Sequence, residues 1–207
     1  RRDLEARARA AAGAARLVVP PVVGILALQG DFEAHAKLVE SAGAHPREVR
    51  TAAGLDGIDA LIIPGGESSV MTLGIEREQL AGPLTDLIRS GLPTLGTCAG
   101  MIVLDRSHLN LLDISAKRNA FGRQLKSFEL DVELAGVAGG PFHAVFIRAP
   151  WVADYGEDVA VLASVDGHPV AVRQRNIVAI AFHPELAGDA RLHRLLVQET
   201  PAESRSA

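Results

Sequence analysis

The sequence predicts an α/β fold in which a central, mostly parallel sheet carries helices on both faces. Residues 22–28 and 60–63 are continuous apolar runs of strand length, typical of strands buried on both faces of a parallel sheet. Segments of helical periodicity follow these runs, so strand and helix alternate along the N-terminal half. Ligands of such sheets bind at the carboxyl ends of the strands, so functional residues are expected in the loops after them.

Length and composition narrow the class of protein. The chain has 207 residues, enough for one domain with a sizeable core, and its net charge of -4 argues against a nucleic-acid partner. One cysteine excludes an intrachain disulfide and fits a reducing compartment, so we expect a cytoplasmic protein. No apolar run reaches the ~20 residues of a membrane span, and no Cys/His cluster predicts a metal site.

The expected organisation is a single domain over residues 22–200. Before it, residues 1–21 form an alanine- and arginine-rich extension that is flexible or helical, and after it residues 201–207 form a polar tail. Within the N-terminal half, Asp31 is expected to cap a helix over 32–42 that Gly43 ends. The remaining elements expected in this half are strands at 46–49, 60–63 and 94–95 and a helix at 80–90.

The C-terminal half is expected to hold short strands separated by turns, followed by a helix over about 189–199. Its glycine- and proline-containing turns bound five short apolar segments. The last two could form a hairpin around residues 174–176. The strand candidates are 128–134, 144–148, 159–164, 170–173 and 177–182.

The segment from Gly96 to Gly100 is a G-x-C-x-G sequence, the thiol version of a nucleophile elbow. A buried strand ends before it and a helix begins at Ala99, so Cys98 stands at a strand-to-helix turn. Small neighbours leave room for a reacting carbonyl, the helix N-terminus favours a thiolate, and the Ala99 N–H can face an oxyanion. A lone cysteine is commonly a buried structural residue. Its place between two glycines favours the nucleophile instead.

A histidine and a glutamate two residues apart follow the last strand. In extended backbone His183 and Glu185 would point to the same side, so the carboxylate could orient the imidazole. Cys98 would then be the nucleophile, His183 the base and Glu185 the orienter. Alone, His183 would be read as a surface histidine after a strand, and the elbow changes that interpretation.

The loop Pro64-Gly-Gly-Glu-Ser-Ser69 follows the strand at 60–63 and is expected beside the elbow. Its two glycines let backbone N–H groups face a ligand, so Gly65 or Gly66 could supply a second oxyanion donor. Without the other motifs it would be a plain glycine-rich turn. It lacks the G-K-[ST] of a phosphate-binding loop.

Together, these motifs resemble class I (triad) glutamine amidotransferases, which have a flavodoxin-like sandwich fold. The chain is more closely similar to the family of glutaminase subunits of pyridoxal 5'-phosphate synthase. This closer resemblance rests on residues 24–31, 118–124 and 146–150, and on Ile102 two residues after the elbow's second glycine. Residues 1–21 have no counterpart in that family, and the segment 105–111 is shorter than usual.

The resemblance implies hydrolysis of glutamine to glutamate and ammonia by Cys98, His183 and Glu185. It also implies an oxyanion hole formed by the N–H groups of Gly66 and Ala99. The glutamine-binding residues that it implies are Gly66, Glu67, Ser68, Arg118, Ile147 and Arg148. The ammonia would pass to a barrel-shaped synthase subunit, and this chain itself would bind no cofactor and no metal. Neither nucleic acid nor a membrane is an expected partner.

Two other functions stay open from the sequence. One is a stand-alone cysteine hydrolase of the same superfamily, against which the segment 118–122 argues. The other is a non-catalytic scaffold whose site the extension or the short 105–111 segment has disabled. The presence of Cys98, His183 and Glu185 argues against that alternative.

Overall fold

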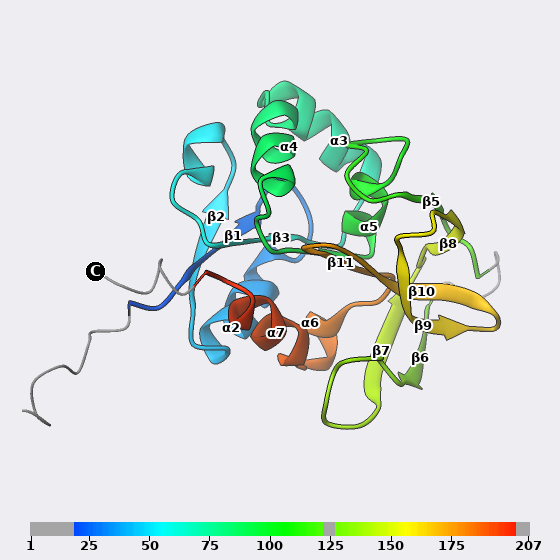
Figure 1. The fold of residues 1–207 in the computed structure, drawn as a ribbon. Helices are drawn as coiled ribbons and strands as arrows, with labels where there is room; N and C mark the ends of the chain where they lie inside the picture. Colours follow the sequence, from blue (N-terminus) through cyan, green and yellow to red (C-terminus); the bar gives the residue numbers. More distant parts are fainter. Residues whose placement is uncertain (1–18, 122–126, 202–207) are drawn as a thin grey trace, which may run out of the picture.

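The structure is a computed structural model that describes residues 19–121 and 127–201. Its centre is a seven-stranded sheet in the order β2-β1-β3-β4-β11-β10-β9 (Figure 1). The five strands from β2 to β11 in that order are parallel, and β10 and β9 continue the sheet antiparallel. This confirms the α/β class. The strands are β1 Val22–Leu26, β2 His45–Val49, β3 Ala60–Ile63, β4 Thr94–Thr97, β9 Ala160–Val165, β10 His168–Gln174 and β11 Ile177–Ile180.

Helices cover both faces of the sheet. In Figure 1, α3, α4 and α5 lie on one side of the sheet and α2, α6 and α7 on the other. The first group is α3 Ser68–Arg77, α4 Ala81–Arg89 and α5 Ala99–Leu104, and the second is α2 Phe32–Ser41, α6 Pro184–Ala187 and α7 Arg191–Gln198; a short 3-10 helix spans Ala52–Leu55. The sheet is therefore buried on both sides, as its continuous apolar strands require.

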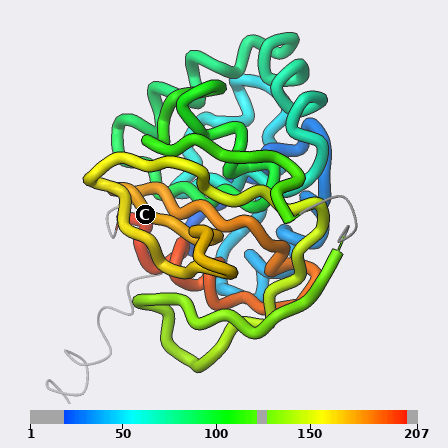
Figure 2. The backbone as a smooth tube through the Cα atoms, turned by 90° about the vertical axis from the view of Figure 1, so that its right-hand side faces the viewer, coloured from blue at the N-terminus to red at the C-terminus, as the bar shows by residue number. Residues whose placement is uncertain are grey.

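Two small antiparallel sheets lie at the β9 end of the main sheet (Figures 1 and 2). One pairs β5, Ile114–Lys117, with β8, Trp151–Tyr155, and the other pairs β6, Ser127–Val132, with β7, Phe142–Ile147. The last residue of β7 reaches the loops that follow β3 and β4, so this end of the molecule contributes to the site described below.

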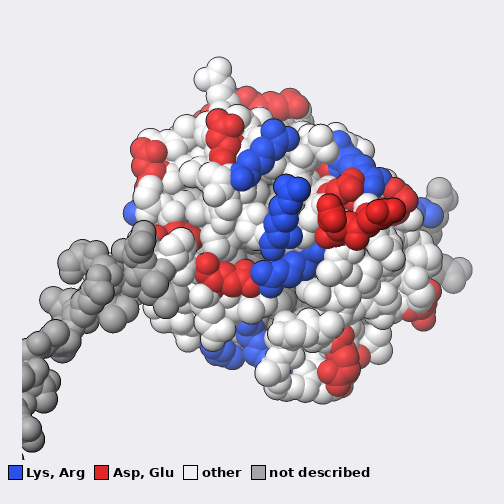
Figure 3. Space-filling view, in the orientation of Figure 1, with Lys and Arg blue, Asp and Glu red and all other residues white. Residues whose placement is uncertain are grey.

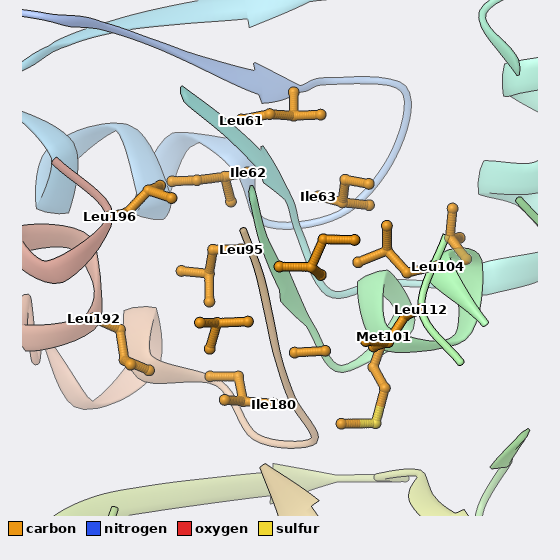
Figure 4. Packing of buried hydrophobic residues seen from close by; sticks show 14 of the residues in the cluster. Leu61, Ile62, Ile63, Leu95, Met101, Leu104, Leu112, Ile180, Leu192 and Leu196 are labelled. Atoms are coloured by element: carbon orange, nitrogen blue, oxygen red, sulfur yellow. The ribbon is translucent and has the colours of Figure 1, made fainter. Parts of the chain in front are cut away.

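The core on both faces is built from alternating residues of the central strands. Ile62 of β3 pairs in register with Leu95 of β4, and both point toward Leu192 and Leu196 of α7 (Figure 4). Ile63, the next residue of β3, points to the opposite face, toward α5. All of these side chains are buried. Because strand side chains alternate, one run of apolar residues supplies both layers of the core.

Several local expectations were wrong. Asp31 precedes α2, but its side chain makes no capping hydrogen bond, because its backbone (φ -91°, ψ 47°) is not in the extended conformation that a capping residue adopts. Helix α3 is not predicted by the sequence patterns, and neither are β5 and β8. In α3, Gly74 interrupts the helical pattern; it lies there against Leu28, where a Cβ would come within 3.2 Å of Cδ1. Glu67, rather than Asp31, caps a helix, and accepts a 3.3 Å hydrogen bond from the Ser69 N–H.

The other boundaries agree with expectation to within about two residues, and the hairpin around 174–176 is confirmed as β10–β11. Most of the N-terminal extension (residues 1–18), most of the tail (202–207) and residues 122–126 lie outside the described residues. Within the described ranges, no helix is long and apolar enough to cross a membrane. Figure 3 shows acidic and basic side chains interspersed on one face of the molecule.

The glycine that opens α5 gives a test of how closely helix and sheet pack. A Cβ on Gly100 would overlap the backbone carbonyl oxygen of Ile63, which cannot move without shifting β3. We expect Gly100→Ala to lower the free energy of unfolding by ~1 to 3 kcal/mol, the usual cost of overpacking. Urea denaturation of the full chain measures it.

Gly82→Ala is the matched control, because Gly82 lies in α4 with nothing within 4 Å of its would-be Cβ. This substitution should raise stability by roughly 0.5 to 1 kcal/mol, since alanine loses less entropy in a helix. Equal effects of the two substitutions would contradict the close contact between α5 and β3.

Candidate active site

Three neighbouring strands bring the expected site residues together. In the sheet, β4 lies between β3 and β11, with Gly96 opposite Ile63 and Thr97 opposite Ile180. The three strands run parallel, so their carboxyl ends meet at one edge. The loop with Gly65 and Gly66, the elbow with Cys98 and the segment with His183 all leave from that edge.

The elbow holds Cys98 in an unusual backbone conformation. Its φ of 47° and ψ of -101° are rare for a residue with a side chain, and such strained positions concentrate at functional sites. The Cys98 N–H donates a 2.8 Å hydrogen bond to the carbonyl of Ile180, which ties the turn to β11. A Cβ on Gly96 would come within 2.7 Å of Cδ1 of Leu104, so this turn requires a glycine there.

His183 and Glu185 are paired, as expected, but not by the expected geometry. Nδ1 of His183 lies 2.7 Å from Oε1 of Glu185, and both residues are buried. His183 is extended (φ -111°, ψ 90°), but Pro184 then starts helix α6 and Glu185 lies within it. The pairing therefore comes from a strand-to-helix turn and not from a continuing strand, because proline favours the first position of a helix.

The environment of His183 favours its protonated form. Burial lowers the pKa of the ring, but hydrogen bonding with Cys98, then with Glu185, and attraction to both negative groups raise the pKa to about 10. His183 is therefore cationic at neutral pH. A cationic imidazole beside Cys98 stabilises the thiolate, which is the nucleophilic form of the side chain.

The Gly65-Gly66 loop packs directly against the triad. A Cβ on Gly65 would overlap the ring of His183, and Gly66 has a φ of 144°, a conformation that other residues avoid. The Glu67 N–H donates a 2.6 Å hydrogen bond to Oε1 of Gln29, in the loop after β1, which holds this loop in place. Neither the Gly66 nor the Ala99 N–H donates a hydrogen bond to another described residue.

A cavity of about 360 Å³ opens onto Cys98, within the range of small-molecule sites. The cavity is lined by all the residues expected to bind glutamine and by three that sequence reasoning did not name: Ser69, Ile102 and Asn119 are the additions to Gly66, Glu67, Ser68, Arg118, Ile147 and Arg148. Ile102 was noted only as a mark of the resemblance. The carbonyl oxygen of Ile147 lies 3.8 Å from the Cys98 sulfur.

The two arginines of the cavity differ in their contacts. Arg118 donates hydrogen bonds to Glu67 (3.0 Å), to Ser69 (2.9 Å) and to the hydroxyl of Ser68, so it ties the β3 loop to the segment after β5. Arg148 is exposed and makes no ion pair with the described residues. Arg148 and Asn119 also have positive φ angles, 44° and 47°, so strained backbone surrounds the cavity.

Two features of the site were not found from the sequence. Gln29 was read as part of a turn, although it anchors the β3 loop. His35 of α2 lies 3.3 Å from Oε2 of Glu185, in the interior behind the triad. A histidine within an amphipathic helix carries no sequence signal for such a contact, because its partner comes from a distant part of the chain.

The arrangement can carry out nucleophilic cleavage of an acyl group. A thiol beside a cationic imidazole, a carboxylate on the far side of that imidazole and two unpaired backbone N–H groups are the parts that acyl transfer requires. Arg148 provides an unpaired cation at the mouth of the cavity for an anionic end of a substrate.

Comparison with known proteins agrees with this chemistry. A model of the SNO glutamine amidotransferase family matches residues 25–202. The chain is 50% identical, over 186 residues, to the pyridoxal 5'-phosphate synthase subunit PdxT of Mycobacteroides abscessus, covering 86% of this chain and 96% of that protein. It is equally identical over 186 residues to the subunit of the same name from Frankia alni, covering 86% and 94%.

Solved structures agree as well. A crystal structure of a glutamine amidotransferase is 43% identical and superposes with a TM-score of 0.80, covering 85% of this chain and 97% of that one. A putative GMP synthase protein from Thermoplasma acidophilum, at 18% identity and a TM-score of 0.63, covers 86% of this chain and 93% of its own and shares the fold. By its sequence, its fold and the family model, this chain belongs to the SNO glutamine amidotransferase family.

Proposed function

We propose that this protein is the glutaminase subunit of a pyridoxal 5'-phosphate synthase, with Cys98, His183 and Glu185 as its catalytic triad. The observation that carries the proposal is the placement of Cys98 and His183 on the wall of the cavity, with Glu185 2.7 Å behind the imidazole. The relatives named as pyridoxal 5'-phosphate synthase subunits support the assignment to that enzyme.

In the first half of the reaction the Cys98 thiolate attacks the side-chain amide carbon of glutamine. The N–H groups of Gly66 and Ala99 stabilise the oxyanion of the tetrahedral intermediate. His183 is already protonated, as its raised pKa requires, so it donates its proton to the leaving nitrogen. The C–N bond breaks, ammonia leaves, and the glutamyl group remains on Cys98 as a thioester.

In the second half, neutral His183 takes a proton from water, which attacks the thioester. The carbon–sulfur bond breaks, glutamate leaves, and Cys98 and His183 return to the thiolate and the imidazolium. Glu185 stabilises each cationic state of His183 through its 2.7 Å hydrogen bond to Nδ1 and fixes the tautomer that faces Cys98.

Substrate recognition is assigned to the other residues that line the cavity. The unpaired Arg148, with Arg118, would bind the α-carboxylate of glutamine, because a guanidinium matches the geometry of a carboxylate. Glu67 and the carbonyl of Ile147 are acceptors placed for the α-ammonium, and Ser68 adds a hydroxyl.

The partner and the organisation of the chain complete the proposal. Ammonia would pass to a barrel-shaped synthase subunit rather than to solvent. Residues 22–200 would be one glutaminase domain, supported by a continuous buried core from β1 to α7. The site would act in the cytoplasm, because a nucleophilic thiol works only where it stays reduced.

Replacing the nucleophile tests the triad. Cys98→Ala should abolish glutamate release while leaving the fold unchanged, because Cys98 is the only thiol in the chain. A glutamine analogue that alkylates thiols should add one label to the wild-type protein and none to the variant. Glutamate release by Cys98→Ala near the wild-type rate would exclude the triad mechanism.

The charge of Glu185 gives a second prediction. Glu185→Gln should reduce turnover, by less than the ~10⁴-fold seen when a serine triad loses its carboxylate, because a thiol needs less help from its base. The pKa of His183, about 10 in the wild type, should fall, because a hydrogen bond and a negative charge that favour the cation are gone. NMR titration of the histidine rings measures it.

The same shift makes part of the stability pH-dependent. The pKa of His183 lies above the ordinary 6.5, so the stabilisation from its charged form is complete below 6.5 and is lost as pH rises toward 10. Glu185→Gln should flatten this pH dependence of the unfolding free energy. A variant with unchanged turnover and an unchanged His183 titration would show that the two residues do not act as a pair.

Dependence on the synthase subunit tests the proposed partner. Free ammonia would be wasted without an acceptor, so we expect the chain alone to release glutamate slowly and the synthase subunit to accelerate it. Reorientation of the Gly65-Gly66 peptide is a sufficient switch, because one oxyanion donor contributes ~10² to 10³ in turnover. Steady-state glutamate release is measured with and without the synthase. Equal rates would support a stand-alone hydrolase, and no release in either condition a non-catalytic scaffold.

A further inference from the structure

A chain of buried polar side chains continues from Glu185 into the interior. Oε2 of Glu185 makes no hydrogen bond among the described residues, although the side chain is fully buried. Nε2 of His35 on α2 lies 3.3 Å from it, and Nδ1 of His35 lies 2.9 Å from Nε2 of His193 on α7. Both histidines have no exposed surface. The catalytic steps proposed above use neither of them.

We propose that His35 is a positioning residue for the triad, whose Nε2–H is directed at Oε2 of Glu185, and that His193 sets the tautomer of His35 that makes this possible. The inference rests on the proposed glutaminase function for its kinetic consequence. Its structural part, the tautomers of the two rings, stands on the contacts alone.

Both rings are neutral. Burial, then repulsion by His193 and His183 in their charged forms, places the pKa of His35 well below its ordinary value. Burial also lowers the pKa of His193 to about 4, against a smaller raising effect of Asp189. A neutral imidazole carries one N–H and one lone pair, so each ring donates from one nitrogen and accepts at the other.

One assignment satisfies the contacts. If His193 carries its proton on Nε2, it donates to Nδ1 of His35, and His35 then carries its own proton on Nε2. That proton faces two acceptors at 3.3 Å, Oε2 of Glu185 and the hydroxyl oxygen of Thr97. The group left over is Nδ1 of His193, which has no partner among the described residues and is here a bare lone pair.

The opposite assignment fails at both ends. With the proton of His35 on Nδ1, its Nε2 lone pair would face the carboxylate of Glu185, and two acceptors would repel at 3.3 Å. Nδ1 of His193 would then carry a buried N–H with no partner among the described residues. Buried orphan donors are rarer in proteins than orphan acceptors, so this arrangement costs more.

The consequence is a carboxylate held from both sides. Glu185 presents Oε1 to His183 and Oε2 to His35, which fixes the carboxylate plane and hence the imidazole of His183. Thr97, which shares the His35 proton, precedes Cys98 on β4. The same neutral N–H therefore contacts the supports of both the base and the nucleophile without touching the substrate cavity.

The tautomers are tested on the wild-type chain without any assay of activity. NMR of the full-length protein, with ¹⁵N-labelled histidine, distinguishes the Nδ1–H and Nε2–H forms of a neutral ring by the shifts of its two nitrogens. We expect both His35 and His193 to be neutral and protonated on Nε2 at pH 7. An Nδ1–H signature for either ring, or a cationic His35, would overturn the proposal.

The kinetic test compares two amides at position 35. His35→Gln places an amide nitrogen near the position of Nε2 and can still donate to Glu185, whereas His35→Asn places its amide near Nδ1 and cannot. We expect His35→Asn to lower kcat for glutamine by ~10- to 100-fold, the scale of a misplaced catalytic group, with KM unchanged. His35→Gln should keep most of kcat. The assay includes the synthase subunit.

His45→Gln is the matched control, because His45 is exposed on the edge strand β2. Alkylation of the single cysteine by iodoacetamide reports on Cys98 even if the protein is not a glutaminase. It should slow in His35→Asn but not in His35→Gln or His45→Gln. Wild-type alkylation and kcat in His35→Asn would refute the positioning role. Absence of glutamine turnover in the wild type, with the alkylation pattern as expected, would refute the proposed function alone.

Discussion

The parallel pairing of β4 with β3 on one side and β11 on the other is the constraint on which the site depends. These two ladders fix where each strand ends, and the register that places Gly96 opposite Ile63 and Thr97 opposite Ile180 brings three loops to one edge. The N–H of Cys98 extends the ladder one residue further, to the carbonyl of Ile180. The nucleophile, the glycine loop and the base are thus placed by backbone hydrogen bonds, and their side chains need only small adjustments.

Close packing at this edge explains why glycine occupies so many of its positions. Gly100 lies against the carbonyl of Ile63, Gly96 against Leu104, and Gly65 against the ring of His183. A side chain at any of them would separate elements that the chemistry needs in contact. The positive φ of Cys98 and Arg148 adds local strain of ~1 to 3 kcal/mol per residue, which persists because the buried core around β3, β4 and β11 holds the backbone in place.

Local patterns in the sequence were sufficient for the elbow, the triad and the cavity, because each is a short motif directly after an apolar strand. They were insufficient where a partner lies far away. Helix α3 is interrupted by Gly74, which is required by its contact with Leu28. The pairing of His183 with Glu185 was expected from an extended strand, whereas Pro184 starts a helix there. Periodicity placed His35 in a helix, but not beside His193, a residue 158 positions away.

The buried polar cluster also shows how one interior keeps histidines in opposite charge states. His183 has two negative partners, Cys98 and Glu185, and its pKa rises to about 10 despite burial. His35 touches the same carboxylate but lies deeper, beside His193 and near the cationic His183, so burial and repulsion keep its pKa low. A second cation there would compete for Glu185 and weaken its hold on His183. A neutral ring that donates one N–H can steady the carboxylate while leaving its charge to the catalytic imidazole, and this is the arrangement a thiolate–imidazolium pair requires.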